Sequence, residues 1–418
     1  MSDVLFLTHR VPYPPNRGDR IRSYHLLRYL AKRARVHLAC LSDEPVPAET
    51  QQVLSQLCHR ITYAQLHPQL RWLHGARSLL SGRTVTEGLF QARQLRKTVT
   101  AWSGDTSFDA TLVFCSSMFQ YLKTPALQQT PTVVDLVDVD SEKWFDYASG
   151  NRGLKRWLYH LEAKRVRRLE QTMANRAQAL TVVSEDEAKL FRSFCPTDHM
   201  HAVGNGVDTD YFALQRTPSS EPQCVFVGVL DYYPNVDGVC WFCEEVWPAV
   251  RQAVPTARFS IVGRNPVQKL KDLERLDGVT VVGEVPDVRP HLATANVSIA
   301  PLLIARGVQN KVLEAMAAGT PVLASRQALT GLDLAPGVDA LLAEDAPAWQ
   351  RQLVDLLQNE TLQSQLAARG RAFVQEHHSW ERQLAAFSKL LNLPNASDTT
   401  STGTTTADPH NTPSMSAS

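Results

Sequence analysis

The stretch from Ala305 to Val322 holds residue types that suit a diphosphate and a pair of hydroxyl groups. Gly307 lets the backbone approach a ligand closely, and a helix expected to begin near Asn310 presents N–H groups suited to phosphate. Lys311 adds a full positive charge there. Glu314 lies one turn further along the same face, where a carboxylate can accept hydrogen bonds from paired hydroxyls such as those of ribose. The alternative is an i,i+3 ion pair on an ordinary helix.

Two residues near the N-terminus follow the first expected strand and lie where a substrate can be met. Gly18 begins an apolar-periodic helix, and a glycine there lets backbone N–H groups face a phosphate or a sugar. A plain turn is the alternative for Gly18. His9 follows the strand directly and is a candidate for contact with a substrate hydroxyl, with a hydrogen-bonded loop histidine as the alternative.

Asp138 and Asp140 follow an expected strand whose carboxyl end should face a cleft. A carboxylate at Asp138 can position a hydroxyl or assist its deprotonation. Helix capping is the alternative, because Asp140 and Ser141 are good N-cap residues for the helix that follows. The Asp-x-Asp spacing is that of some metal sites, but we interpret it as coincidence and expect neither a metal nor another cofactor.

Short β-rich apolar runs alternate with helix-periodic stretches, which predicts parallel βα winding. In the first half we expect strands at Val4–Thr8, Val36–Leu41, Ala110–Phe114, Val133–Val137 and Ala179–Val183. After a linker at 218–222, we expect strands at Cys224–Val227, Arg258–Val262, Val279–Val282, Val297–Ala300 and Val322–Ala324. The prediction is an α/β protein with two Rossmann-like doubly wound domains that face a central cleft, where ligands bind.

The predicted domains are residues 1–215 and 223–376, followed by a helix within 377–393 that has Ser379 as its N-cap. Residues 395–418 are mostly Ser, Thr, Pro, Asn and Asp. Such a segment cannot bury enough apolar surface to offset its chain entropy, so we predict a disordered tail.

Composition and charge narrow the possible partners and compartment. The 418 residues have a formal net charge of +1, which gives no global field for nucleic acid. Seven irregularly spaced cysteines and an opening MSDVLFLTHR without a signal-peptide pattern favour the cytoplasm. No apolar run approaches the roughly 20 residues that a spanning helix needs.

Two stretches combine basic and apolar residues in the manner of helices that lie on anionic lipid. One carries Arg152, Lys155, Arg156, Lys164, Arg165, Arg167 and Arg168, with Trp157, Leu158, Tyr159 and Leu161 between them. The other runs from Leu70 to Leu80. Both suggest peripheral contact with the inner face of the plasma membrane, and a solvated face over a buried stripe is the alternative.

The run Leu313-Glu-Ala-Met-Ala-Ala-Gly-Thr-Pro-Val322 resembles the second half of the signature of the retaining glycosyltransferases of family 4. Further matches are Val203–Asp208 with Tyr211-Phe212, Val262–Pro266, Gly283–Val288 and Ser379–Glu381. The resemblance implies a GT-B fold whose last helix crosses back to the N-terminal domain. It also implies that Glu314 binds the ribose and that the loop at Gly283 to Val285 lies near the base. Gly263 and Arg264 are then donor contacts, and Asn205 sits at the interdomain hinge.

Three further segments resemble the sugar transferases of bacterial exopolysaccharide and PEP-CTERM/exosortase systems: His9–Arg20, Asp135–Ser141 and Gly228–Asp237. The resemblance implies transfer of a sugar from a nucleoside diphosphate sugar to a hydroxyl of a glycan, with a polyprenyl-linked acceptor. No nucleic acid is implied as a partner.

Two departures from the family pattern concern donor recognition. Arg306 stands eight residues before Glu314, where the family has a carboxylate that meets the donor sugar. Val229 and Asn235 stand near the place of an Arg–Lys pair that commonly meets the diphosphate. Lys311 and Arg306 are candidates to supply that charge to the leaving diphosphate, and a surface salt bridge is the alternative for Arg306. A GT-B epimerase of nucleotide sugars and an inert nucleotide-sugar-binding subunit are the rival functions.

Overall fold

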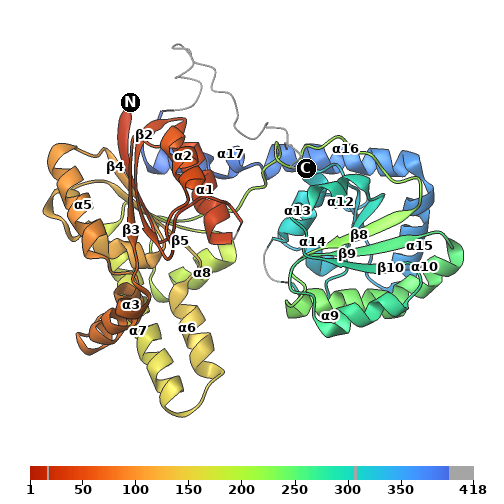
Figure 1. The fold of residues 1–418 in the computed structure, drawn as a ribbon, viewed down its shortest axis with the longest axis horizontal. Helices are drawn as coiled ribbons and strands as arrows, with labels where there is room; N and C mark the ends of the chain where they lie inside the picture. The colour runs from red at the N-terminus through yellow and green to blue at the C-terminus, as the bar shows by residue number, and fades with distance from the viewer. Residues whose placement is uncertain (17, 306–307, 395–418) are drawn as a thin grey trace. The chain divides into compact units, whose positions relative to one another are not determined.

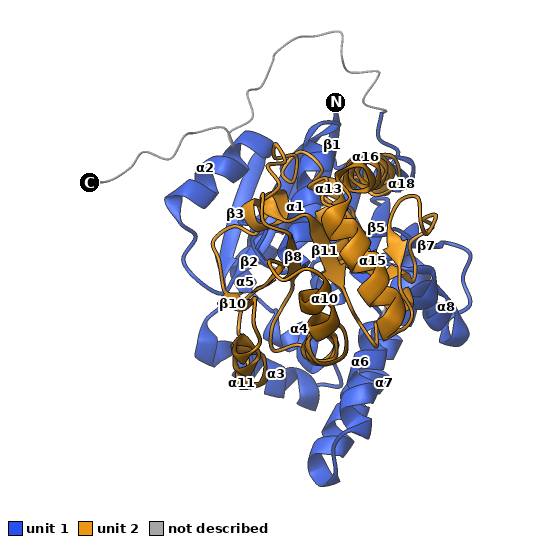
Figure 2. Ribbon diagram, turned by 90° about the vertical axis from the view of Figure 1, so that its right-hand side faces the viewer, with its two compact units in different colours: residues 1–204, 384–418 blue, residues 205–383 orange. Residues whose placement is uncertain are grey.

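The protein forms two α/β units (Figure 1). The computed structural model describes residues 1–16, 18–305 and 308–394, so the expected tail at 395–418 lies outside the described residues. Unit 1 comprises Met1–Gly204 and the described residues from Leu384, and unit 2 comprises Asn205–Gln383 (Figure 2).

The units divide at Gly204, earlier than the expected domain end at 215, because the segment after Gly204 bonds to the second unit. Val207 forms an isolated bridge with Ser379. Further along, Arg216 Nη2 donates to the carbonyl oxygens of Ala295 and Asn296 at 3.0 and 3.1 Å. These bonds attach residues 205–222 to unit 2.

Unit 1 is built on a seven-stranded parallel sheet with the order β3-β2-β1-β4-β5-β6-β7. Its strands are β1 (Ser2–Thr8), β2 (Ala34–Ser42), β3 (Arg60–Gln65), β4 (Ala110–Phe114), β5 (Thr132–Val137), β6 (Ala179–Val182) and β7 (Met200–Ala202). All five strands expected in this half are present. The sequence pattern missed β3 and β7 because β3 is only half-buried at a sheet edge and β7 is three residues long.

Helices connect these strands in the βα manner. They are α1 (Gly18–Ala31), α2 (Ala48–Leu57), α3 (Pro68–Leu80), α4 (Val85–Leu89), α5 (Arg93–Asp105), α6 (Asp140–Ser149), α7 (Gly153–Arg176) and α8 (Glu185–Phe194), with 3-10 segments η1 (Ser116–Lys123) and η2 (Pro125–Leu127). The α6–α7 hairpin extends away from the sheet, and α3 lies at the same end of the unit (Figure 1, Figure 2).

Unit 2 is built on a six-stranded parallel sheet with the order β10-β9-β8-β11-β12-β13. Its strands are β8 (Gln223–Val227), β9 (Arg258–Val262), β10 (Val279–Gly283), β11 (Val297–Ala300), β12 (Val322–Ala324) and β13 (Leu341–Leu342). Only β13 was not expected, because two residues carry no periodicity. Two parallel sheets with alternating helices confirm the predicted α/β fold class.

The helices of unit 2 follow the same alternation. They are α9 (Tyr233–Trp241), α10 (Trp247–Ala253), α11 (Gln268–Lys271), α12 (Arg289–Thr294), α13 (Asn310–Ala317), α14 (Arg326–Leu329), α15 (Ala346–Gln358), α16 (Glu360–His377) and α17 (Trp380–Gln383). Between them lie a π-helical turn, η3 (Phe242–Val246), and a 3-10 turn, η4 (Asp272–Arg275).

The end of the described chain packs in unit 1 as α18 (Ala385–Leu390). The Tyr29 and Ser388 hydroxyls are 2.6 Å apart, and Phe387 is fully buried. The single helix expected within 377–393 is two helices, α17 and α18.

A buried ion pair joins α1 to the centre of the first sheet. Arg22 Nε donates to Asp135 Oδ2 at 2.7 Å, and both side chains are almost fully buried. Thr181 Oγ1 donates to the same carboxylate at 2.9 Å, and Arg22 Nη1 donates to the Gly204 carbonyl at 3.1 Å. Because every partner is hydrogen-bonded, this pair fixes α1 against β5, β6 and the last residue of unit 1.

Candidate active site

Helix α13 carries the two residues on which the sequence prediction depends most. Its apolar side chains Val312, Leu313, Ala315 and Met316 are buried, whereas Lys311 and Glu314 keep partial exposure. Lys311 and Glu314 are three residues apart and therefore share one helix face. The buried positions fix that face toward the carboxyl edge of the second sheet, where the neighbouring β11 ends at Ala300.

Lys311 is a largely desolvated cation with a neutral hydrogen-bond partner. Its ammonium donates to Asn235 Oδ1 at 2.5 Å and lies 4.6 Å from the centre of the Phe226 ring. Burial lowers the pKa of Lys311 to about 8, and the nearby Glu314 carboxylate offsets only part of that effect. A phosphate group beside this ammonium would restore a counter-charge and favour the protonated form.

The Asn235 amide is held so that its oxygen faces Lys311. Asn235 is buried, and its Nδ2 donates to the Val229 carbonyl at 2.8 Å, which leaves Oδ1 for the ammonium. The sequence placed Asn235 where related chains carry a cation, but it did not reveal this contact. The only signal in the sequence was that Asn235 stands near the place where the family pattern has a diphosphate contact.

Glu314 lies in similarly desolvated surroundings. Burial raises the pKa of this carboxyl group, and Lys311 opposes the rise. Burial also raises the pKa of the Tyr211 phenol, with smaller contributions from Asp287 and Glu314 among other charges. The Arg289 guanidinium stacks 3.8 Å from the Tyr211 ring and pairs with Asp287 at 2.7 Å. This tyrosine–arginine cluster was not a sequence candidate, although Tyr211 belongs to a matching motif.

Gly263 and Gly283 allow the strand ends of unit 2 to lie close together at the carboxyl edge of the sheet. Gly263 has φ +151°, and a Cβ there would lie 1.6 Å from the Gly228 carbonyl oxygen, so only glycine fits. Its N–H donates to the Gly283 carbonyl at 2.8 Å. Arg264 is exposed just beyond this contact, and Val285 is partly buried beyond Gly283. The candidates Gly263, Arg264, Gly283 and Val285 therefore gather at one edge.

The remaining donor candidates divide between described and undescribed residues. Asn310 is exposed at the first position of α13, and Asn205 is the first residue of unit 2. Arg306 and Gly307 lie outside the described residues, so the structure does not bear on them.

His9 and Gly18 lie at the carboxyl end of β1 in unit 1. The His9 ring stacks on Phe114 with a centroid distance of 5.8 Å, and its Nε2 is 3.4 Å from Asp19 Oδ2. Gly18 begins α1, and a Cβ there would meet no atom within 4 Å. Space around Gly18 is thus open, and His9 is held by an aromatic ring and a carboxylate.

Asp138 and Asp140 both bind Lys143, from the turn where β5 leads into α6. Lys143 Nζ is 2.7 Å from Asp138 Oδ2 and 3.5 Å from Asp140 Oδ1. Burial acts to lower the pKa of Lys143, but Asp140 and Asp138 outweigh it and raise the pKa. Ser116 Oγ also donates to Asp140 at 2.6 Å.

The alternative of helix capping by Asp140 or Ser141 is wrong for α6. Val139 occupies the N-cap position and makes no side-chain cap. Two glutamates from α8 and α7 replace the cap: Glu187 accepts from the Val139 N–H at 2.8 Å, and Glu170 accepts from the Ser141 N–H at 3.0 Å. Local sequence could not reveal caps supplied by residues so distant in the chain.

Both halves of the chain match known protein families. The family described as Glycosyltransferase Family 4 matches residues 20–211, and the family described as Glycosyl transferases group 1 matches residues 221–359. A protein of Klebsiella pneumoniae, described as an uncharacterized 44.6 kDa protein in cps region, is 20% identical over 402 residues, covering 93% of this chain and all of that protein.

Solved structures show the same fold. Sucrose-phosphate synthase of Thermosynechococcus elongatus has a TM-score of 0.60 at 17% identity, covering 94% of this chain and 98% of that one. Anabaena HepE, solved with UDP, has a TM-score of 0.63 at 14% identity, covering 94% and 100%. TarM, known from S. aureus, has a TM-score of 0.61 at 10% identity, covering 94% and 99%.

The two doubly wound units and the two matching families define a glycosyltransferase with the GT-B fold. The residues that match Glycosyltransferase Family 4 precede those that match Glycosyl transferases group 1, and Lys311 and Glu314 lie among the latter. Among the described helices, none combines the length and apolar character required to cross a bilayer.

Proposed function

We propose that this enzyme transfers a sugar, with retention of configuration, from a nucleoside diphosphate sugar to a hydroxyl of a polyprenyl-linked glycan. The product belongs to exopolysaccharide synthesis of the kind associated with PEP-CTERM/exosortase systems. The sequence segments at His9–Arg20, Asp135–Ser141 and Gly228–Asp237 support that association. The relative in a Klebsiella cps region supports polysaccharide synthesis more generally.

The observation that carries the proposal is the Lys311–Glu314 face of α13. A largely desolvated ammonium with pKa lowered to about 8 is suited to a diphosphate, and a carboxylate one turn away is suited to ribose hydroxyls. Structures of HepE with UDP and with UDP-glucose support a uridine nucleotide as the first donor to test.

Lys311 also supports transfer without a metal. When the bond from the anomeric carbon to the diphosphate breaks, negative charge develops on the leaving phosphate oxygen. A fixed ammonium beside that oxygen stabilises the charge, as a metal would in other enzymes. Asp138 and Asp140 are already bound to Lys143, so their spacing is explained by this ion pair.

Donor binding tests the proposal. A panel of nucleotide sugars is screened for thermal stabilisation of the full chain, and the best donor is then titrated by calorimetry. Lys311→Ala and Glu314→Gln should each weaken binding by about 10-fold or more, since each removes a charged partner. Lys271→Ala, which removes an exposed lysine of α11, is the matched control and should bind as the wild type does.

Turnover separates the proposal from its rivals. The wild type should release nucleotide slowly in water and faster with polyprenyl-linked acceptors, giving the α-anomer from an α-linked donor. Formation of an epimeric nucleotide sugar without acceptor would indicate the epimerase. Tight donor binding with no turnover on any acceptor would contradict a transferase role.

A further inference from the structure

Helix α3 has its side chains arranged opposite to the usual pattern of a surface helix. Its buried residues are Gly75 and Ser78, whereas Trp72, Leu73 and Leu80 are 66%, 63% and 89% exposed. These three positions recur at helical spacing and thus form one outward apolar face. The sequence alternative of a solvated face over a buried apolar stripe therefore fails for α3.

Close packing of small residues holds α3 in this orientation. A Cβ on Gly88 of α4 would lie 2.4 Å from the His74 carbonyl oxygen and 2.8 Å from Gly75 Cα. A Cβ on Gly75 would press against Leu89 at 3.2 Å. The α3–α4 crossing needs glycine at Gly88 and is tight at Gly75, so it leaves no room for a large side chain on the inner face of α3.

The tip of the neighbouring α6–α7 hairpin has the same character. Leu154 and Trp157 are 72% and 59% exposed in the first turns of α7. Arg152, Lys155 and Arg156 are exposed around them.

Hydrogen bonds connect this hairpin to α3 and α4. Arg165 Nη1 donates to the Leu79 carbonyl at 2.7 Å and to the Arg83 carbonyl at 2.9 Å. The Glu162 carboxylate accepts from the N–H groups of Val85 and Thr86. α3, α4 and α7 are thus held together at one end of unit 1 (Figure 1, Figure 2).

The charge of this surface identifies its partner. Residues 50–86 and 147–161 contain no Asp or Glu, yet they carry Arg77, Lys155 and Arg156 among other cations. Outward tryptophan and leucine side chains among cations suit the boundary between headgroups and acyl chains, and the cations suit anionic headgroups.

We infer that the outward face of α3 and the tip of the α6–α7 hairpin dock the enzyme on an anionic lipid bilayer. We call these two patches the docking surface. The inference extends the proposed function, because a bilayer would deliver a polyprenyl-linked acceptor. Docking itself requires neither donor nor catalysis, so the two proposals are tested separately.

Vesicle flotation of the full chain tests the inference. The vesicles contain either phosphatidylglycerol with phosphatidylethanolamine or phosphatidylcholine alone. The wild type should bind the anionic vesicles more tightly, and salt should weaken that binding. Trp72→Ser/Leu73→Ser and Leu154→Ser/Trp157→Ser should each weaken binding to anionic vesicles by about 10-fold or more. Leu190→Ser, on α8 of the same unit, is the apolar control and should bind as the wild type does.

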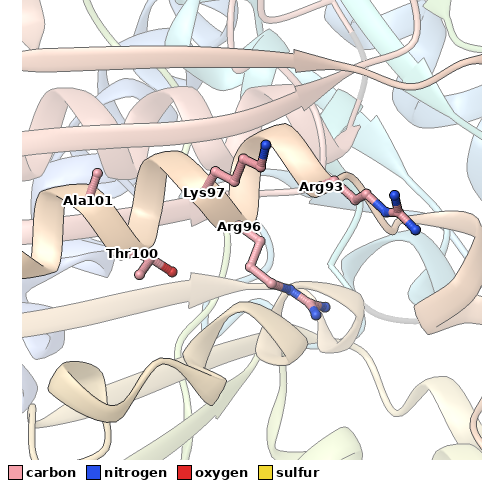
Figure 3. A pocket seen from close by; sticks show the side chains of 5 residues that line it. All are labelled: Arg93, Arg96, Lys97, Thr100 and Ala101. Atoms are coloured by element: carbon pink, nitrogen blue, oxygen red, sulfur yellow. The ribbon is translucent and has the colours of Figure 1, made fainter.

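Helix α5 offers a control for charge alone. Arg93, Arg96 and Lys97 line a shallow basic depression together with Thr100 and Ala101, without large apolar side chains (Figure 3). Lys155→Gln/Arg156→Gln should weaken binding to anionic vesicles by about 10-fold or more, because each cation contributes near a charged bilayer. Arg93→Gln/Lys97→Gln removes the same charge and should change binding less than threefold (roughly).

Three results would overturn the inference. They are a wild type that does not float with anionic vesicles at low salt, an α5 variant that loses as much binding as the hairpin variant, and a Trp72→Ser/Leu73→Ser variant that binds normally. If the wild type forms dimers in solution without vesicles, and the Trp72→Ser/Leu73→Ser variant does not, the surface binds a second copy of the chain instead. The donor should stabilise these variants against heat as much as it stabilises the wild type. If the donor stabilises none of the proteins, including the wild type, the result would count against the proposed function only.

Discussion

Each unit carries a lysine in the first turn of a helix at the carboxyl edge of its sheet, but the two lysines have opposite surroundings. Lys143 in unit 1 binds two carboxylates, which raise its pKa despite burial. Lys311 in unit 2 bonds to a neutral amide oxygen and lies over an aromatic ring, and burial lowers its pKa to about 8. The first charge is neutralised by the protein itself, whereas the second is suited to an anionic ligand.

The largest expected effect comes from a cation that is even more completely neutralised. Arg22→Met should destabilise the fold by about 3–5 kcal/mol, because the Asp135 carboxylate would be left buried without its ionic partner. Denaturant unfolding at neutral pH measures this change. Arg28→Met, on a less buried position of α1, is the control and should cost much less. A loss below about 1 kcal/mol for Arg22→Met would show that the ion pair does not organise unit 1.

Removal of Lys311 in unit 2 should lower the rate of turnover. Lys311→Ala should lower kcat/KM for donor and acceptor by roughly 100- to 1000-fold, since the leaving diphosphate loses a preorganised cation. Steady-state kinetics with the best donor measures the change, and Lys271→Ala again serves as the control. Equal activity of Lys311→Ala and wild type would show that Lys311 has no role in turnover and that the two lysines do not differ in function.

In the absence of ligand, Lys311 should lower the free energy of unfolding. The folded pKa of Lys311 is about 8, below its ordinary value of 10.5, so between these values the unfolded chain binds more protons than the folded one. Stability from this group therefore rises as pH increases through that window and is lowest below it. Lys311→Met should accordingly be more stable than wild type near neutral pH, by about 1–2 kcal/mol.

Thermal unfolding at several pH values between about 7 and 10 checks this prediction, with the difference between the two proteins shrinking as pH rises. Saturating donor should reverse the order, because it binds the wild type more tightly. A difference that stays constant with pH would show that the ammonium is not the destabilising group.

Much of the fold could be predicted because its strands are short, apolar and β-branched, as in Val133–Val137 and Val297–Ala300. Lys311 and Glu314 could be placed on one face because helix geometry fixes i,i+3 neighbours. Their environment could not be predicted. Asn235 and Phe226 reach Lys311 from α9 and β8, and no local pattern records contacts between distant segments.

The orientation of α3 was unpredictable for a similar reason. Its sequence has apolar residues at helical spacing, which normally indicates a buried stripe. The deciding residues are glycines, Gly75 within α3 and Gly88 in α4, and their effect depends on a crossing between two helices. A sequence pattern shows that a helix has an apolar face but does not show which way that face points.

The smallest expected effect belongs to the lysine of unit 1. Lys143→Gln should lower stability by less than about 1 kcal/mol, because the Lys143 and Asp138 side chains are partly exposed and solvent screens their attraction. Turnover should change by less than threefold (roughly), since an already neutralised cation has little left to offer a phosphate. If Lys143→Gln instead lowered kcat as strongly as Lys311→Ala, the two lysines would share a catalytic role. Asp138 would then be a group that Lys143 positions for the acceptor, and Asp138→Asn should reproduce the loss in kcat without a comparable loss of donor binding.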